Sequence, residues 1–475
     1  MKNSLSTASA PLLLLACCFM AGMVAGSCWP VAVWWWAALA GLVVLSAGLR
    51  NRGALQSLAL AGCMAVAGAL LMSLEQQRKE RFFGCSERPF RAVIVSSPVE
   101  KARTVAVDAV TISSQWPVRC YIYNKEEGRR FGIGQTLLVG QRPEAPRGAA
   151  PAHCLLRTGQ WRRVATSQSQ LPLLLRSRLW FLHQRQLLLQ RYRALGAAND
   201  AQAVVAAMTL GDRSRLSARL RSAYAGTGAA HVLALSGLHL GMVCSLLLLV
   251  VRGRRWRPLA QGVLVVAIWA FAFLVALPAS VVRAATMLSV YALLSMGRRR
   301  GLSVNVLAFT AMVMLVASPL SLFDVGFQLS FAAVFAILAL MPLWDSWVSA
   351  QWLQGHRLAG WLWSLVTISV SAQVGTAPLV AYYFGQFPVC FLLTNLVAVP
   401  AVWLLLHGAL LMLLLPVAAP AVLALAHGLN AFMLWLAAQP WASIGGLHPT
   451  ALQVALAYVA IAAVVAALMR LQRQG

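Results

Sequence analysis

Three polar side chains, those of His231, Ser236 and His239, lie inside one apolar stretch of the chain. Imidazole and hydroxyl groups can exchange protons, coordinate metals or hydrogen-bond to anions, and in hydrocarbon they are costly without such a role. No acidic residue lies nearby to orient an imidazole for a hydrolase, and two histidines eight positions apart make a poor metal site. We therefore expect neither catalysis nor a metal here, but a polar path through a membrane.

The Ser236-Gly237 pair adds a prediction about the backbone of this stretch. On a straight helix of about 3.6 residues per turn, His231 and Ser236 would point roughly 140° apart. Both can line one path only if the helix breaks near Ser236-Gly237. Such a break is tolerated at membrane depth only inside protein or beside a water-filled cavity.

Further polar residues occur in other apolar stretches. Arg283 follows the turn Leu277-Pro-Ala-Ser, so it either snorkels to the outer surface or, if it lies deeper, needs a phosphate or Asp324 as its counter-ion. Gln328 and Asn395 either line a path or join neighbouring helices. The candidate residues of the membrane path are His231, Ser236, Gly237, His239, Arg283, Asp324, Gln328 and Asn395.

These residues must be positioned by the rest of the chain, whose composition is that of a polytopic α-helical membrane protein. Of the 475 residues, 60% are hydrophobic and 11% are charged. We expect about twelve spans, some re-entrant or broken. They are 11–27, 31–49, 54–73, 231–251, 258–277, 281–297, 302–317, 325–343, 360–381, 389–415, 421–439 and 451–469. With the short arginine-bearing loops in the cytoplasm, both termini are cytoplasmic and the polar region 75–230 lies on the outer side.

That outer region is strongly basic. Residues 75 to 221 contain 25 Lys and Arg but 10 Asp and Glu, a net charge of +15 within a chain of +27. The charge indicates an anionic partner, either lipid headgroups or an extended polyanion.

Residues 75–170 are expected to form a small exported β-barrel of the oligonucleotide/oligosaccharide-binding (OB) kind. Four to six short alternating runs between turn clusters predict its strands. Aromatic residues interleaved with arginines suit single-stranded nucleic acid, although half or more of these aromatics could be barrel core. The candidate contacts are Arg91, Arg103, Arg119, Tyr121, Tyr123, Arg129 and Arg130.

Cys85, Cys120 and Cys154 are disulfide candidates in this region, and the sequence does not choose the pair. Residues 171–195 predict an amphipathic helix at the outer interface, with Leu175, Leu179, Leu182 and Leu189 toward lipid. Two shorter helices are expected near 200–210 and 215–225, the second capped by Ser214.

Six motifs resemble those of the ComEC-type competence proteins, the inner-membrane channels of bacterial natural transformation. They are Met208-Thr-Leu-Gly-Asp-Arg-Ser, His231-Val-Leu-Ala-Leu-Ser-Gly-Leu-His-Leu-Gly, Val282-Arg-Ala-Ala-Thr-Met, Asp324-Val-Gly-Phe-Gln-Leu-Ser-Phe, Tyr382-Tyr-Phe-Gly-Gln-Phe and Asn395-Leu-Val-Ala-Val-Pro.

The hydropathy, charge and strand patterns divide the chain into spans in 1–74, an exported domain in 75–170, amphipathic interfacial helices in 171–230 and a membrane region in 231–475. The resemblance implies that this last region is a competence-type channel. It also implies passage of single-stranded DNA into the cytoplasm, with an outer-side DNA receptor and cytosolic motor or recombination proteins as partners. The membrane would be the bacterial inner membrane, whose lipids are further partners.

Two features limit what the resemblance implies. Many members carry a metallo-β-lactamase-like domain after the last span, and the sequence lacks its His-x-His-x-Asp-His cluster. We therefore expect no nuclease activity; a naturally short member, an interrupted gene and a trimmed chain are all compatible with this end. No lysine follows a glycine, so a nucleotide-binding P-loop is absent and no cofactor is expected. The alternative function is a small-molecule or lipid-linked transporter with a structural exported domain.

Overall fold

The computed structural model describes residues 11–29, 32–48, 53–84, 89–101, 103–141, 143–144, 152–165, 171–196, 199–250, 257–296 and 304–474. The chain divides into two compact units. The sheet unit comprises Ala10–Arg185 and Ala308–Asp324. Of the described residues, the helical unit comprises those of Gln186–Leu307 and of Val325–Gln474.

The sheet unit begins with three apolar helices: α1 (Pro11–Cys28), α2 (Ala32–Gly48) and α3 (Gly53–Gly84). Helices α1 and α3 pack with their backbones in close approach, because a Cβ added to Gly22 would lie 1.7 Å from the carbonyl oxygen of Ala65. A Cβ added to Gly26 or Gly68 would lie 2.3 or 2.1 Å from a carbonyl oxygen of the opposite helix. Small residues at such a contact are typical of helices that associate in membranes.

A seven-stranded sheet follows, with the order β6-β4-β3-β1-β5-β7 and with β2 paired to β3. All pairings are antiparallel except that of β4 with β6. Its inner face is a core that includes Ile94, Val107, Ile122 and Leu137. The elements are β1 (Phe90–Ile94), β2 (Val99–Glu100), β3 (Val105–Thr111), β4 (Pro117–Ile122), α4 (Lys125–Arg129), β5 (Thr136–Val139), β6 (Ala152–Leu156) and β7 (Trp161–Val164).

The prediction of four to six strands was too low, because the sheet has seven. Strands β1, β3 and β4 coincide with the three expected runs. Burial alternates along β4, whereas β1 ends in three buried residues and β3 is buried at every position except Asp108. Strand β2 has two residues, and β7 reads Trp-Arg-Arg-Val with no buried position. Neither has an alternation that the sequence could reveal.

The helical unit starts within α5 (Leu173–Ala194), which crosses the boundary between the units. It continues with α6 (Asp200–Leu210), α7 (Ala218–Gly226), α8 (Ala230–Leu233), α9 (Gly237–Val250), α10 (Arg257–Leu274), α11 (Ala279–Met296), α13 (Val325–Asp345), α14 (Ala350–Gly355), α15 (Arg357–Phe384), β8 (Gln386–Pro388), α16 (Phe391–Leu414), α17 (Ala419–Ala437), β9 (Ser443–Gly445) and α18 (Ala451–Gln474). Helix α12 (Val304–Ala317) divides between the two units.

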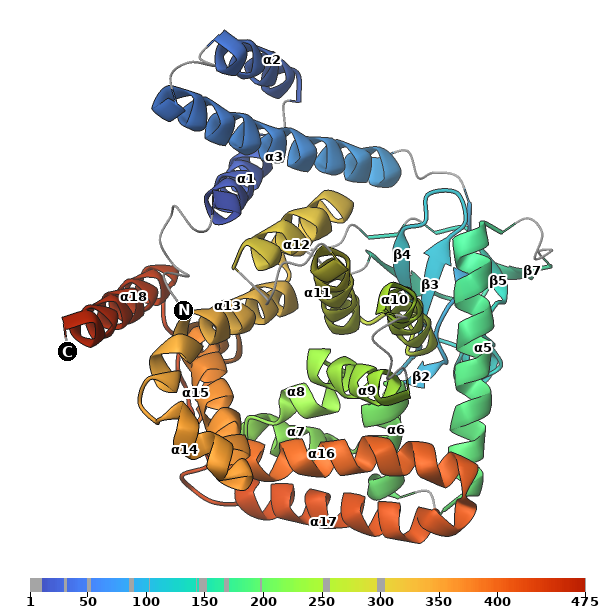
Figure 1. Ribbon diagram of the computed structural model, residues 1–475. Coiled ribbons are helices and arrows are strands. Elements are labelled where there is room, and N and C mark those ends of the chain that lie inside the picture. Colours follow the sequence, from blue (N-terminus) through green and yellow to red (C-terminus); the bar gives the residue numbers. More distant parts are fainter. Residues whose placement is uncertain are drawn as a thin grey trace. The chain divides into compact units, whose positions relative to one another are not determined.

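The largest core of the helical unit lies where α6 and α7 pack against α16 and α17 (Figure 1). Tyr224 is fully buried there, and its hydroxyl donates a 2.9 Å hydrogen bond to Oδ1 of Asn430. This pairing satisfies a phenol that would be costly to bury alone.

Among the described residues, seven helices are long and apolar enough to cross a membrane. They are Pro11–Cys28, Gly53–Phe83, Val325–Asp345, Arg357–Phe384, Phe391–Leu414, Pro416–Ala437 and Ala451–Gln472. The chain is thus a helix-rich, polytopic membrane protein. All the apolar segments expected to span are helical over most of their length, but several are shorter, so the count of about twelve stays a prediction.

Two expectations about the region 171–230 were wrong. The leucine stripe of α5 is not lipid-facing: Leu175, Leu182 and Leu189 are at most 7% exposed, and the exposed apolar residues are Leu173, Leu174, Trp180 and Leu187. Helix α7 is capped by Ser217, whose hydroxyl accepts from the backbone N–H of Leu220. Ser214 is not at the N-cap position, because it lies three residues before Ser217 in the preceding turn.

Candidate functional site

The expected break in the 231–241 stretch is present. Helix α8 ends at Leu233, Ala234 is extended (φ −86°, ψ 117°), and α9 begins at Gly237. The carbonyl of Leu235, which the break frees, accepts a hydrogen bond from the hydroxyl of Ser280 on α11. A polar partner of this kind is what allows non-helical backbone among apolar helices.

Ser236 and His239 form a small polar cluster at the start of α9. The backbone N–H of Ser236 donates to Nδ1 of His239 at 3.3 Å, and the Ser236 hydroxyl lies 3.0 Å from the same nitrogen. Because a backbone N–H can only donate, Nδ1 is the acceptor, and the proton of the neutral ring sits on Nε2. The side chain is fully buried, and Nε2 has no hydrogen-bond partner among the described residues. The cluster therefore holds a buried N–H donor ready for a polar ligand.

Arg283 lies on α11 and is only 6% exposed. The turn before α11 has a strained backbone, since Ala276 and Leu277 have φ values of 74° and 55°. Helix α11 also lies against the start of α9, because a Cβ on Gly237 would be 3.2 Å from Cβ of Ala284. Strained backbone of this kind clusters at functional sites.

The remaining path candidates fall at several places. Gln328 on α13 accepts a 2.7 Å hydrogen bond from the hydroxyl of Tyr383 on α15, so it does join neighbouring helices. Asn395 on α16 has a buried Oδ1 without a hydrogen-bond partner among the described residues. His231 has Nδ1 3.0 Å from the carbonyl of Gly228. Asp324 ends the short 3-10 helix Pro319–Phe323 and belongs to the sheet unit, so its pairing with Arg283 stays a prediction.

The outward face of β4 and the residue directly after this strand carry three of the predicted DNA contacts. Arg119, Tyr121 and Tyr123 alternate with the buried Val118, Cys120 and Ile122. Two cations lie over the tyrosine rings: Nζ of Lys101 is 4.8 Å from the centroid of Tyr121, and Cζ of Arg157 is 6.0 Å from that of Tyr123. We call Tyr121, Tyr123, Lys101 and Arg157 the tyrosine face. Lys101 and Arg157 lie on other segments, so the sequence pattern of β4 alone could not include them.

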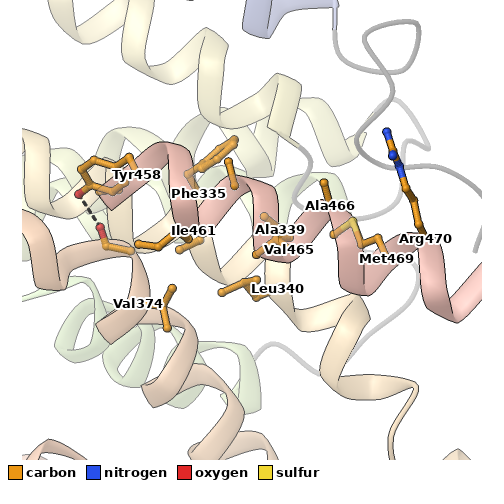
Figure 2. Close-up of a pocket in the computed structure, with 14 residues that line it drawn as sticks. Phe335, Ala339, Leu340, Val374, Tyr458, Ile461, Val465, Ala466, Met469 and Arg470 are labelled. Atoms are coloured by element: carbon orange, nitrogen blue, oxygen red, sulfur yellow. Dashed lines mark hydrogen bonds between the residues drawn. The ribbon is translucent and has the colours of Figure 1, made fainter. Parts of the chain in front are cut away.

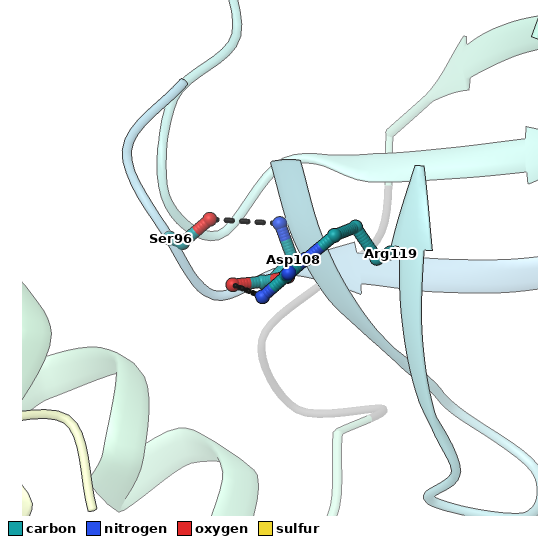
Figure 3. Close-up of polar contacts among 3 residues, drawn as sticks. All are labelled: Ser96, Asp108 and Arg119. Atoms are coloured by element: carbon teal, nitrogen blue, oxygen red, sulfur yellow. Dashed lines mark hydrogen bonds and ion pairs between the residues drawn. The ribbon is translucent and has the colours of Figure 1, made fainter. Parts of the chain in front are cut away.

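Two predicted contacts are held by acidic residues. Arg119 binds Asp108 with two hydrogen bonds, of 2.6 and 3.2 Å, across the β3–β4 pair (Figure 3). The hydrogen bond to Asp108 raises the pKa of Arg119. Arg129 pairs with Glu100, and this hydrogen bond lowers the pKa of the Glu100 carboxyl. Arg91, Arg103 and Arg130 are exposed.

Several of the aromatics belong to the core instead. Phe131 is 4% exposed, Phe90 and Trp161 pack against the same core, and Trp116 stacks on Phe82 from α3. The reading that half or more of the aromatics are structural therefore holds for this sheet.

Cys120 and Cys154 lie directly opposite each other in the parallel β4–β6 pair, and both are buried. The Cys154 thiol and burial raise the pKa of Cys120 well above its ordinary value. Cys85 falls outside the described residues.

Comparison with known proteins gives a family match. A family model described as "Competence protein" matches residues 208–471. The chain is 32% identical over 202 residues to "ComE operon protein 3" of Bacillus subtilis (strain 168), covering 42% of this chain and 25% of that protein. It is 31% identical over 214 residues to an uncharacterized protein of Aquifex aeolicus (strain VF5), covering 44% of this chain and 47% of that protein. The chain thus spans a quarter to a half of these relatives, and no solved structure matches it.

Proposed function

The chain belongs to the competence protein family, and we propose that it passes single-stranded transforming DNA from the outer side of the bacterial inner membrane into the cytoplasm. The observation that carries this proposal is the broken helix at 234–236, with the buried Nε2–H of His239 beside it. A buried donor in a break between apolar helices suits a phosphate oxygen or water in a polar path.

The other path candidates support the same role. Arg283 supplies a buried cation, and Asn395 a buried polar group whose Oδ1 has no partner among the described residues. The phosphates of a DNA strand that moves through the membrane pass one after another, so each must be bound briefly and then released, as neutral hydrogen-bond donors do. An arginine in the path would attract the negatively charged DNA backbone into it.

The sheet supports an OB-like domain that receives the strand. Strands β1, β3 and β4 form an antiparallel meander, β5 returns to β1, and β6 pairs with β4 in parallel. The tyrosine face lies on the outside of this sheet. Tyrosine rings offer stacking surfaces for bases, and Lys101 and Arg157 offer charge for phosphates.

The proposal includes partners and a side of the membrane. An outer-side receptor protein would deliver the DNA, and a cytosolic motor or recombination protein would draw it inward. The exported domain would lie outside, and both termini would lie in the cytoplasm.

The test follows labelled DNA in a transformable bacterium that lacks its own copy of the gene. Wild-type protein should restore cytosolic arrival of DNA. His239→Phe, which keeps a flat ring but removes the Nε2–H, should lower arrival by about 10-fold or more, the effect of losing one buried hydrogen bond. His239→Gln, whose amide reaches a similar position, should retain much of the activity.

The matched control is His427→Phe, because His427 is an exposed histidine on α17. Capture of DNA outside the inner membrane should be unchanged in every strain. Normal transformation in the deletion strain would overturn the channel proposal, and uptake of a small molecule instead of DNA would favour the transporter.

A further inference from the structure

A cavity of about 570 Å³ lies between α13, α15 and α18 in the helical unit. Its walls are apolar, and they include Phe335, Ala339, Val374, Ile461 and Val465 (Figure 2). Two polar side chains lie at opposite ends, Tyr458 and Arg470. The Tyr458 hydroxyl donates a 2.8 Å hydrogen bond to the carbonyl of Gly375, so its proton is already used. Arg470 is the charged side chain of the lining. The volume falls in the range of small-molecule sites, which is about 300–1,000 Å³.

The cavity is built between one tight and one loose helix contact. Helices α13 and α15 are in backbone contact, because a Cβ on Gly375 would lie 2.4 Å from Cβ of Ala336. Helix α18, in contrast, has no buried side chain among those described. The cavity is therefore a groove under α18 that opens to the surroundings of the helices, which for a membrane protein means lipid.

The length of the groove matches one leaflet of a bilayer. Tyr458 and Arg470 are twelve positions apart on α18, or about 18 Å along the helix axis. Half of the hydrocarbon core is about 15 Å thick. An acyl chain that lies along the groove would thus start near mid-membrane and reach Arg470 at its glycerol end.

The end at Arg470 has the features of a membrane–water boundary. Nε2 of Gln472 donates to the hydroxyl of Ser346 at 2.7 Å, which ties this end of α18 to the end of α13. Trp347, next to Ser346, is 58% exposed and packs edge-on against Trp344. Exposed tryptophans mark the headgroup level, and this end is the one predicted to be cytoplasmic.

We propose that this groove binds one acyl chain of an anionic glycerophospholipid, with Arg470 paired to the lipid phosphate. Arg470 takes no part in the ion pairs Arg78–Glu75, Arg119–Asp108, Arg129–Glu100 and His153–Glu144. A guanidinium forks around a phosphate, and basic groups between helices on the cytoplasmic side suit anionic headgroups. The site is independent of DNA passage, so either proposal can fail alone.

Native mass spectrometry of the full chain in mild detergent tests the groove. After exposure to phosphatidylglycerol, the wild type should retain one phospholipid per chain. Val465→Trp should lose it, because the indole fills the groove. Val464→Trp is the matched control: Val464 is the adjacent residue, is 59% exposed and does not line the cavity. Equal lipid retention in the two variants would overturn the proposal.

The charge is tested at the surface, where folding is not at risk. Arg470→Gln should weaken retention of phosphatidylglycerol by roughly fivefold, the effect of one basic residue near an anionic headgroup. Retention of phosphatidylethanolamine should fall less, because its ammonium group offsets the charge of its phosphate. Arg357→Gln, at the exposed start of α15, should change neither. If Arg470→Gln lost both lipids to the same extent, the lipid assignment would be overturned. It would also be overturned if the wild type formed a dimer without lipid and Val465→Trp dissociated that dimer, because a second copy of the chain would then cover the groove.

Discussion

At Gly237 a single added methyl group is already tight, since its Cβ would lie 3.2 Å from Cβ of Ala284 on α11. We predict that Gly237→Val pushes α9 away from α11, costs about 1–3 kcal/mol of stability and impairs DNA arrival in the cytosol. Gly241→Val is the control on the same helix, because a Cβ there meets nothing within 4 Å. Thermal unfolding in detergent and transformation frequency measure the two effects. If both variants behave alike, the close approach has no role.

The two tyrosines of the tyrosine face make a separate prediction about DNA binding. Replacing both Tyr121 and Tyr123 by Ala should weaken the binding of single-stranded DNA to the full chain by about 1–3 kcal/mol for each base that stacks. Replacing both by Phe should retain most of the affinity, because the ring remains. Fluorescence anisotropy at low salt measures this. If the Ala and Phe variants bound single-stranded DNA with equal affinity, the tyrosine face would not be a DNA-binding surface.

Sequence reasoning at this scale found residue types better than residue partners. The polarity of His239 was enough to single it out, since a buried imidazole among leucines is costly. The pairing of Arg119 with Asp108 required the β3–β4 register, which places the two residues directly opposite each other. Without that register, a paired arginine and a free one look the same, and Arg119 and Arg130 were grouped together.

At the scale of elements, β6 is joined to the sheet through its parallel pairing with β4, where Cys120 and Cys154 are opposite residues. Neighbouring strands are about 4.8 Å apart, a separation that a disulfide can bridge. We predict that oxidation joins these two cysteines and, by closing a loop of some 35 residues, stabilises the exported domain by roughly 3–4 kcal/mol. Cys120→Ala and Cys154→Ala should lower the unfolding temperature equally.

The control for the disulfide prediction is Cys244→Ala, a buried cysteine on α9. Because the pKa of Cys120 is raised, its thiol should resist alkylation at neutral pH until the domain unfolds. A full count of free thiols in the oxidised protein, or unequal effects of the two substitutions, would contradict the pairing.

Helices and strands were predicted well where one simple pattern of apolar residues ran through the whole segment. Uniformly apolar runs gave α1, α13 and α16 almost to their ends, and alternation gave β4. The stripe of α5 failed for a physical reason: leucines at helical spacing bury equally well in protein or in lipid, and composition does not distinguish the two. The ends of helices depended on single hydrogen bonds, as at Ser217.

For the whole molecule, contacts within the helical unit agree with the predicted topology. Strands β8 and β9 belong to two loops predicted on the outer side, and they pair with each other. Gly228, also predicted outside, is so close to β8 that an added Cβ would lie 3.1 Å from the Pro388 side chain. On the other side, Gln472 near the predicted cytoplasmic terminus bonds to Ser346 in a loop predicted to be cytoplasmic.

These contacts make the sidedness of the protein testable with single cysteines. Ile444→Cys on β9 and Thr158→Cys in the turn before β7 should react with a membrane-impermeant maleimide added to the outer side of the inner membrane. His356→Cys, between α14 and α15, should react only after the membrane is permeabilised. The physical basis is the arginine distribution, which holds short basic loops in the cytoplasm. Labelling of His356→Cys from outside would invert the topology, turn the tyrosine face toward the cytoplasm and remove the exported domain as the receiver of DNA.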